Sequence, residues 1–177
     1  MSLNKNTEHK AKTLLVACKL KYPQAITDNN IQQNINTRKI MIRQTEFRLT
    51  AKRRGCHLVT QEIIRNLPHP LPKAGLLNLF VKHTSCALTI NENADPDVRS
   101  DMEKILNHMV KENEPYYDHT FEGADDMPAH AKSSLFGVSV NIPITDGKLN
   151  LGTWQGIYLC EFRDYGGERR ITATVYE

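Results

Sequence analysis

The C-terminal third of the chain constrains the fold most, because it reads as a series of short strands joined by tight turns. The pairs Asp146-Gly147 and Gly166-Gly167 provide residues that adopt positive φ values, as hairpin turns require. Strands are predicted at Val138–Ile144, Leu149–Leu151, Gln155–Phe162 and Arg170–Tyr176. We therefore expect the chain to end in an antiparallel meander.

Further strands are predicted upstream of this region. Alternating polar and apolar residues from about Ile40 to Leu49 indicate a half-buried strand that ends before the basic turn at residues 52–55. The apolar runs Leu76–Val81 and Cys86–Ile90 are short and nearly continuous, as is typical of buried strands.

Three helical patterns lie between the strands. Thr60 is the expected N-cap of the first helix, and a proline series from residue 68 ends it. Asp95-Pro96 provides an N-cap and a first-turn proline for the second helix, which is the most regular. The third is predicted from Pro128 to Phe136, with His130 in its first turn and Gly137 at its end.

This pattern predicts one compact α+β domain at residues 39–177, with a mainly antiparallel sheet and two or three helices. Residues 1–38 are rich in Asn, Gln, Lys and Thr and lack a clear apolar period. We interpret them as an N-terminal appendage that is either flexible or forms one short helix.

Composition excludes several classes of protein. The chain has 23 Lys plus Arg and 20 Asp plus Glu, which is too balanced to predict binding to nucleic acid. No segment contains the roughly 18 to 20 apolar residues that span a membrane.

The four cysteines, at positions 18, 56, 86 and 160, have no zinc-knuckle spacing and are expected to be reduced thiols of a cytoplasmic protein. Cys86 and Cys160 lie in apolar runs and are expected to serve packing.

The first candidate for chemistry is the polar group His83-Thr84-Ser85, which separates two apolar strands. These side chains either satisfy the local backbone of a turn or line a pocket. Both interpretations stay open at the level of sequence.

The second candidate is the polar run Asn91–Asp97, which joins a buried strand to the second helix. Capping alone accounts for Asp95. Asn91 and Glu92 are not needed for capping, so an anion or a hard cation such as Mg²⁺ is a plausible ligand for them.

The third candidate contains His119, Asp126 and His130 within a short stretch of sequence. Histidine titrates near neutral pH and also binds transition metals, and a carboxylate can fix its tautomer. A metal site would require the fold to bring His83 to His119 and His130.

The fourth candidate, Gly152–Gly156, contains Trp154, the single tryptophan of the chain. Trp154 is either a core anchor or a stacking surface for a planar heterocycle, with Gln155 reading the polar edge of that ring. Arg163, Arg169 and Arg170 near the last turn are candidates for binding phosphate, although surface arginines are usually solvated.

Residues 80–176 resemble the YjbQ-like family through three blocks, and the resemblance extends upstream to about residue 40 through RRGCHLVTQEI. The blocks are FVKHTSCALTINENADPDVRSDME, YDHTFEGADDMPAHAKSSLFG and IPITDGKLNLGTWQGIYLCEFRD. The resemblance implies a compact α+β fold, a homotrimer and the working label of a secondary thiamine-phosphate synthase. That enzyme would join hydroxymethylpyrimidine diphosphate to thiazole phosphate and release pyrophosphate, with Mg²⁺ as the expected cofactor.

The family's characteristic positions give this interpretation its site residues. Catalytic roles are expected for His83, Glu92, His119 and His130, and a transition metal is expected at the three histidines. Substrate binding is expected for Thr84, Ser85, Asn91, Asp95, Asp126, Thr153, Trp154, Gln155 and Arg169. The ligand would be a small phosphorylated or heterocyclic metabolite.

Two other functions remain open, because the domain has neither a glycine-rich phosphate loop nor an aspartate-rich diphosphate motif. One is a metal-dependent hydrolase that uses the histidines. The other is a module that binds a small metabolite without turning it over.

Overall fold

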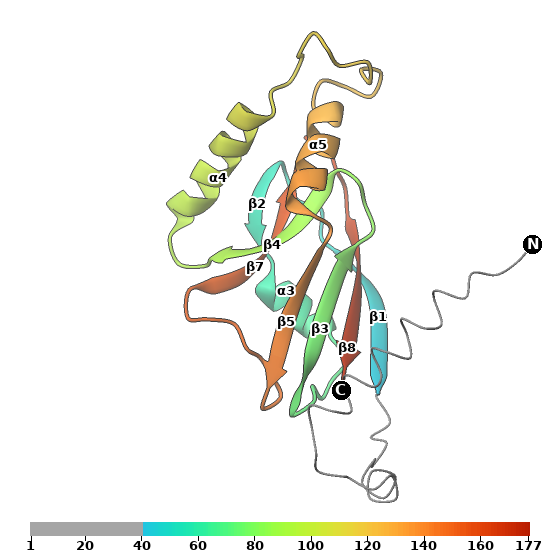
Figure 1. Ribbon diagram of the computed structural model, residues 1–177, viewed down its shortest axis with the longest axis vertical. Helices are drawn as coiled ribbons and strands as arrows, with labels where there is room; N and C mark the ends of the chain where they lie inside the picture. Colours follow the sequence, from blue (N-terminus) through green and yellow to red (C-terminus); the bar gives the residue numbers. More distant parts are fainter. Residues whose placement is uncertain (1–40) are drawn as a thin grey trace, which may run out of the picture. The chain divides into compact units, whose positions relative to one another are not determined.

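A computed structural model describes residues 41–177, and these residues form eight strands and three helices (Figure 1). The expectations for residues 1–38, including Cys18, lie outside the described residues. The strands are β1 (Ile42–Leu49), β2 (Gly55–Leu58), β3 (Ala74–Val81), β4 (Cys86–Glu92), β5 (Ser139–Thr145), β6 (Lys148–Leu149), β7 (Gln155–Glu161) and β8 (Arg169–Tyr176). The helices are α3 (Thr60–Asn66), α4 (Pro96–Met109) and α5 (Asp126–Phe136).

The strands form two antiparallel sheets, which confirms the predicted α+β class. The larger sheet has the order β1-β8-β3-β5-β6, and the smaller has the order β2-β7-β4. The predicted terminal meander is wrong beyond its first hairpin, because β7 joins the small sheet whereas β8 lies between β1 and β3 in the large one. After the β5–β6 hairpin, the chain therefore crosses to the small sheet at β7 and returns to the large sheet at β8.

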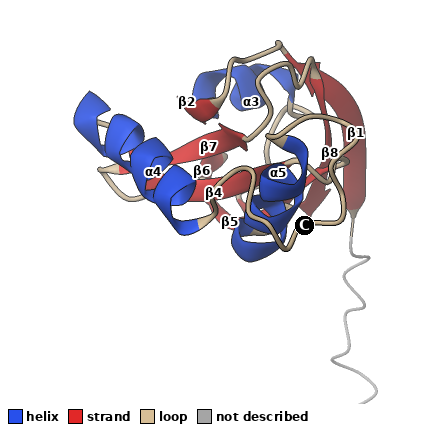
Figure 2. Ribbon diagram, turned by 90° about the horizontal axis from the view of Figure 1, so that it is seen from above, coloured by secondary structure: helices blue, strands red, loops and turns tan. Residues whose placement is uncertain are grey.

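The two sheets share the main core, which also contains Ile63 of α3, and α4 and α5 cover the other face of the small sheet. Ile157 and Leu159 of β7 belong to the core between the sheets. Cys160 of the same strand packs instead with Leu106 of α4 and Ala129 of α5. Figure 2 shows α4 and α5 beside β4 and β7, and α5 packs on β4 while α4 packs on β2. β7 is thus buried on both faces, which explains its continuous apolar sequence.

The apolar run of β3 has a different cause from that of β7. Leu77, Leu79 and Val81 are fully buried, but Leu76 and Phe80 are exposed on the opposite face. The expectation that this run is wholly buried is therefore wrong, because no element of residues 41–177 covers that face of the large sheet at these two side chains.

The helix caps agree with the sequence at two of three ends. Asp95 accepts a hydrogen bond from the backbone N–H of Asp97 at 2.8 Å and Pro96 begins α4, as predicted. Gly137 ends α5 with φ of 87°, also as predicted. Thr60 is not a cap: Val59 precedes α3, and the Thr60 hydroxyl accepts the N–H of Ile157 at 2.8 Å.

Two further expectations concern packing and membranes. Cys86 and Cys160 are fully buried in the two apolar clusters, as their positions in apolar runs predicted. No helix in residues 41–177 combines the length and apolar character needed to cross a membrane.

Candidate functional site

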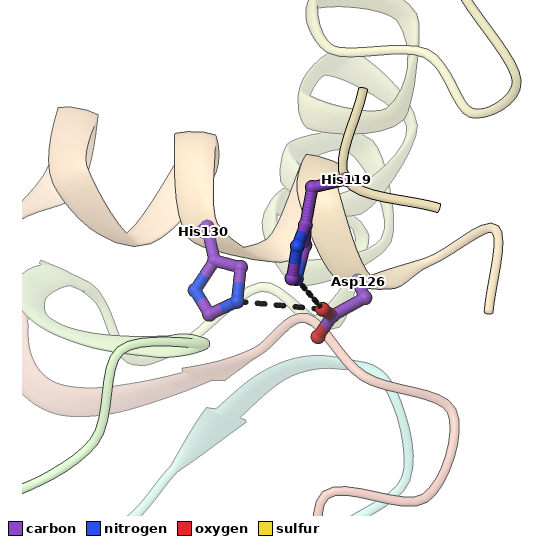
Figure 3. Close-up of side chains that lie close together, drawn as sticks. All are labelled: His119, Asp126 and His130. Carbon is purple, nitrogen blue, oxygen red and sulfur yellow. Dashed lines mark hydrogen bonds and ion pairs between the residues drawn. The ribbon is translucent and has the colours of Figure 1, made fainter. Parts of the chain in front are cut away.

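Three side chains meet where the loop after α4 approaches the start of α5. Asp126 and His130 lie four residues apart and therefore on one face of α5. His119 comes from the preceding loop and points at the same carboxylate (Figure 3). One ligand atom from each residue lies within 4.8 Å of the others, and among residues 41–177 this is the group of His, Cys, Asp and Glu side chains best placed to hold a metal ion.

α5 begins two residues earlier than the sequence predicted, at Asp126 rather than Pro128. His130 therefore lies in the second turn and not in the first. This difference places Asp126 on the helix and so aligns it with His130.

The hydrogen bonds determine which histidine nitrogen faces the carboxylate. His130 Nδ1 lies 3.0 Å from the backbone oxygen of Thr84, which can only accept, so Nδ1 carries the proton in the neutral ring. His130 Nε2 then presents a lone pair towards Asp126 Oδ2 at 3.4 Å. Two lone pairs that face each other repel unless a proton or a cation lies between them.

Asp126 is almost completely buried and is held from the other side by Arg163. The Arg163 guanidinium binds Asp126 Oδ1 and donates to Asp125 Oδ2 at 2.8 Å and to the Glu122 backbone oxygen at 2.8 Å. Burial alone would raise the pKa of Asp125, but the N–H of Asp164 and the charge of Arg163 lower it below its usual value. Arg163 thus orients the Asp126 carboxylate so that its Oδ2 atom faces His119 and His130.

His119 completes the group on its solvent side. Its Nε2 lies 2.7 Å from Asp126 Oδ2, and its side chain is 47% exposed against 34% for His130. Two imidazole nitrogens and one carboxylate oxygen are a donor set typical of Zn²⁺ and other transition metals in sites that keep an open position. The same set without a metal resembles a proton-transfer dyad in which a carboxylate fixes a histidine.

His83 is not part of this group, so the predicted convergence of three histidines is not formed. The backbone N–H of Arg170 donates to His83 Nε2 at 2.8 Å, and His83 Nδ1 lies 3.3 Å from an Arg169 nitrogen. Burial and the positive charge of Arg169 lower the pKa of His83. Asp126 takes the third position that His83 was expected to fill.

Arg169 belongs to a buried ion pair that the sequence did not reveal. Arg169 is 4% exposed and Glu161 is 1% exposed, and they are joined by hydrogen bonds of 2.6 and 2.5 Å. Arg169 Nη2, one of the two nitrogens that donate to Glu161, also reaches the Ser85 hydroxyl at 3.2 Å. The available signal was Glu161 itself, a charged residue inside the apolar run of β7.

A second candidate region lies at the other end of β4. Trp154 is 64% exposed, so it is not a core anchor. Together with Ile90, Asn91, Glu92 and Gln155 it lines an open groove of about 450 Å³. The Gln155 side-chain oxygen accepts the N–H of Gly152 at 2.8 Å, and Asn91 accepts the N–H of Glu92 at 2.8 Å.

The remaining predicted residues occupy loops beside these two regions. Thr153 is exposed next to Trp154, whereas Asp95 uses its side chain as the cap of α4. Thr84 fixes His130 through its backbone oxygen.

The two regions are separated within one chain. His130 is bound to Thr84, before β4 begins, whereas Glu92 ends that strand. The strand between them has seven residues, or roughly 20 Å at about 3.3 Å per residue. The structure therefore brings together His119, Asp126 and His130 at one end, and Asn91, Glu92, Trp154 and Gln155 at the other.

With this geometry in view, comparison with known proteins identifies the family. The model of the family described as "UPF0047 protein YjbQ-like" matches residues 45–177. The chain belongs to the YjbQ-like family. UPF0047 protein YjbQ of Escherichia coli O157:H7 is 51% identical over 133 residues, which cover 75% of this chain and 96% of the relative.

More distant YjbQ-like relatives extend the comparison. UPF0047 protein YugU of Bacillus subtilis is 41% identical over 113 residues, covering 64% of this chain and 83% of the relative. The crystal structure of a YjbQ/UPF0047 family protein from Clostridium acetobutylicum matches with a TM-score of 0.66 and 36% identity, covering 74% of this chain and 98% of that one. These names state a family and no activity.

Proposed function

We propose that this YjbQ-like protein is a metal-dependent hydrolase that holds a transition metal at His119, Asp126 and His130. The observation that carries this proposal is the position of His130 Nε2, which lies 3.4 Å from the buried Asp126 Oδ2 that His119 also contacts, while the backbone oxygen of Thr84 engages the other ring nitrogen. A cation between these atoms would remove the repulsion. Zn²⁺ fits this donor set best.

Each residue of the group has a separate task in this proposal. Thr84 fixes the tautomer of His130, and Arg163 fixes the orientation of Asp126, as partners of metal ligands commonly do. When bound, the ion would lower the pKa of a water molecule and so provide a hydroxide nucleophile near neutral pH. The exposed side of His119 leaves room for a small phosphorylated or heterocyclic substrate to approach.

Metal content tests this proposal directly. After dialysis against Zn²⁺ and removal of free ions, elemental analysis should find one ion per wild-type chain. His119→Ala and His130→Ala should lose the ion, whereas His108→Ala, which removes an exposed histidine of α4, should retain it. Hydrolysis of a panel of phosphate esters should depend on the same ion. A wild-type chain that binds no metal, or variants that bind it equally well, would refute the proposal.

A second candidate function is the secondary thiamine-phosphate synthase that the resemblance implies. The observation favouring it is the exposed ring of Trp154 beside Glu92 in an open groove. An aromatic face of this kind can stack on a pyrimidine ring, and the nearby carboxylate would stabilise the positive charge that develops when pyrophosphate leaves. Mg²⁺ would neutralise the departing pyrophosphate.

The single tryptophan makes this candidate easy to test. Titration with hydroxymethylpyrimidine diphosphate and thiazole phosphate in the presence of Mg²⁺ should quench its fluorescence, and chromatography should detect thiamine phosphate. Trp154→Phe should retain most of the product formation and Trp154→Ala should lose it. Quenching without product would favour a non-catalytic binding module, and neither quenching nor product would exclude this groove as the site.

We also propose a homotrimer in the cytoplasm, as the resemblance implies. Support for self-association comes from exposed apolar side chains on neighbouring strands, where Ile42 of β1 pairs with Tyr176 of β8 and Tyr176 pairs with Leu76 of β3. Light scattering should give the mass of three chains. Leu76→Asp should lower it, whereas Ile105→Asp, on exposed α4, should not. A monomeric wild type would refute the trimer.

A further inference from the structure

Cys56 and Cys160 face each other across neighbouring antiparallel strands. They are partners in the register of β2 and β7, and their sulfur atoms lie 3.4 Å apart. Directly opposed residues in such strands have Cα atoms about 4.5 to 5.5 Å apart. A disulfide requires roughly 4.4 to 6.8 Å. The backbone therefore already holds this pair at a separation at which the two sulfurs can bond.

The two cysteines differ in access to solvent. Cys56 is partly exposed and belongs to β2, which forms an edge of the small sheet. Cys160 is completely buried, under Leu106 of α4 and Ala129 of α5. A small oxidant can therefore reach Cys56 before it can reach Cys160.

Hydrogen bonding between the sulfurs gives them different acidities. The two sulfurs share a hydrogen bond, and this bond lowers the pKa of Cys56 although burial and the charge of Glu103 oppose the effect. The same bond and burial raise the pKa of Cys160 well above its usual value. Cys56 is thus the better nucleophile of the pair, because the thiolate is the reactive form.

We propose that Cys56 and Cys160 are a site of reversible oxidation that forms a disulfide by exchange with a small disulfide such as oxidised glutathione. The Cys56 thiolate attacks one sulfur of the oxidant, forming a mixed disulfide and releasing one glutathione thiolate. Cys160 then attacks Cys56 Sγ, its proton passes to the departing thiolate, and the second glutathione leaves. Two protein thiols are oxidised and one small disulfide is reduced to two thiols.

The disulfide would tie the edge strand β2 to the central strand of the small sheet. It would join residues that are 104 positions apart in the sequence, so the oxidised chain should unfold at a higher urea concentration than the reduced chain. This inference does not depend on the metal site, because neither cysteine belongs to that group.

The experiment uses the full chain with Cys18→Ser, so that three thiols remain, at positions 56, 86 and 160. The protein is equilibrated in mixtures of oxidised and reduced glutathione, quenched with acid, unfolded and alkylated. Mass spectrometry should show the loss of two hydrogen atoms, alkylation of Cys86 alone and a peptide that links Cys56 to Cys160. Reduction should restore all three alkylated positions.

Variants separate the two steps. Cys86→Ser should form the same link, because Cys86 is buried and burial raises its pKa to about 12. Cys160→Ser, or Cys160→Ala if the first fails to fold, should accumulate glutathione on Cys56, and Cys56→Ser should acquire neither modification. Three free thiols in every mixture, or a glutathione adduct that persists while Cys160 is present, would overturn the proposal.

Discussion

At the scale of single residues, the buried pair of Arg169 and Glu161 shows how strongly this core depends on charge balance. Neither side chain contacts much solvent, and two hydrogen bonds join them. Glu161→Gln should destabilise the protein by about 3 to 5 kcal/mol, because it leaves a buried guanidinium without its counter-charge. Urea unfolding followed by circular dichroism measures this change.

The matched control is an ion pair of the same chemistry on the surface. Arg48 and Glu168 lie 3.1 Å apart with side chains that are 60% and 52% exposed. Glu168→Gln should lower the free energy of unfolding by less than about 1 kcal/mol. Equal losses for the two substitutions would show that burial does not decide the strength of the Arg169 pair.

The sequence identified His119, Asp126 and His130 as candidate site residues, but it did not predict which side chains would lie together in the folded chain. His119, Asp126 and His130 are close in the chain, and a helix spacing of four was enough to align two of them. Arg163 is 37 residues from Asp126, and Glu161 is 8 residues from Arg169 on the next strand. No local pattern predicts such pairs. The position of His83 beside Arg169 depends on strand register in the same way.

At the scale of elements, the cap of α4 offers a quantitative check. Asp95 satisfies the N–H of Asp97, which would otherwise have no partner in the helix. Asp95→Ala should lower the free energy of unfolding by about 1 kcal/mol and Asp95→Asn by less, whereas Asp101→Ala, an exposed position within the helix, should change it little. If Asp95→Ala is neutral, the cap does not stabilise α4.

The junction of α4, α5 and β7 predicts a dependence on pH. Burial, followed by the charge of Arg54, lowers the pKa of Lys132 to about 8, while its ammonium donates to Asn107 Oδ1 at 2.7 Å. Between about pH 8 and the usual lysine value, the unfolded chain binds more protons at this group than the folded chain does. The contribution of Lys132 to stability therefore rises with pH through this window and is least favourable below it.

Lys132→Met should remove this contribution. The variant should be more stable relative to wild type at pH 7 than at pH 10, as urea midpoints at both values would show. Lys111→Met, at an exposed position, should keep a constant difference from wild type. A constant difference for Lys132→Met as well would contradict the predicted shift.

Helices were predicted better than strand order, and the reason is physical. The limits of α4 follow from Asp95-Pro96 and from a local apolar period, both of which act within a few residues. Which sheet a strand joins depends on contacts between distant residues, as with β8, which lies between β1 and β3. The turn at Gly166-Gly167 was predicted, but it joins two sheets and not two neighbouring strands.

At the scale of the whole molecule, the described core indicates where the domain begins. Its buried residues start at Leu49, and the family match starts at residue 45. A chain that begins at residue 39 should therefore keep its urea midpoint within experimental error. A fall in the midpoint would show that residues 1–38 contribute to the stability of the domain.

The burial of β7 on both faces should also determine which of its positions tolerate amino-acid substitution. In β3 only alternate positions are buried, so a saturation mutagenesis screen should show sensitivity with a period of two. In β7 every residue from Gly156 to Glu161 is buried, so the screen should show an uninterrupted block of intolerance. Variation among natural sequences should then be rare along the whole of residues 156–161.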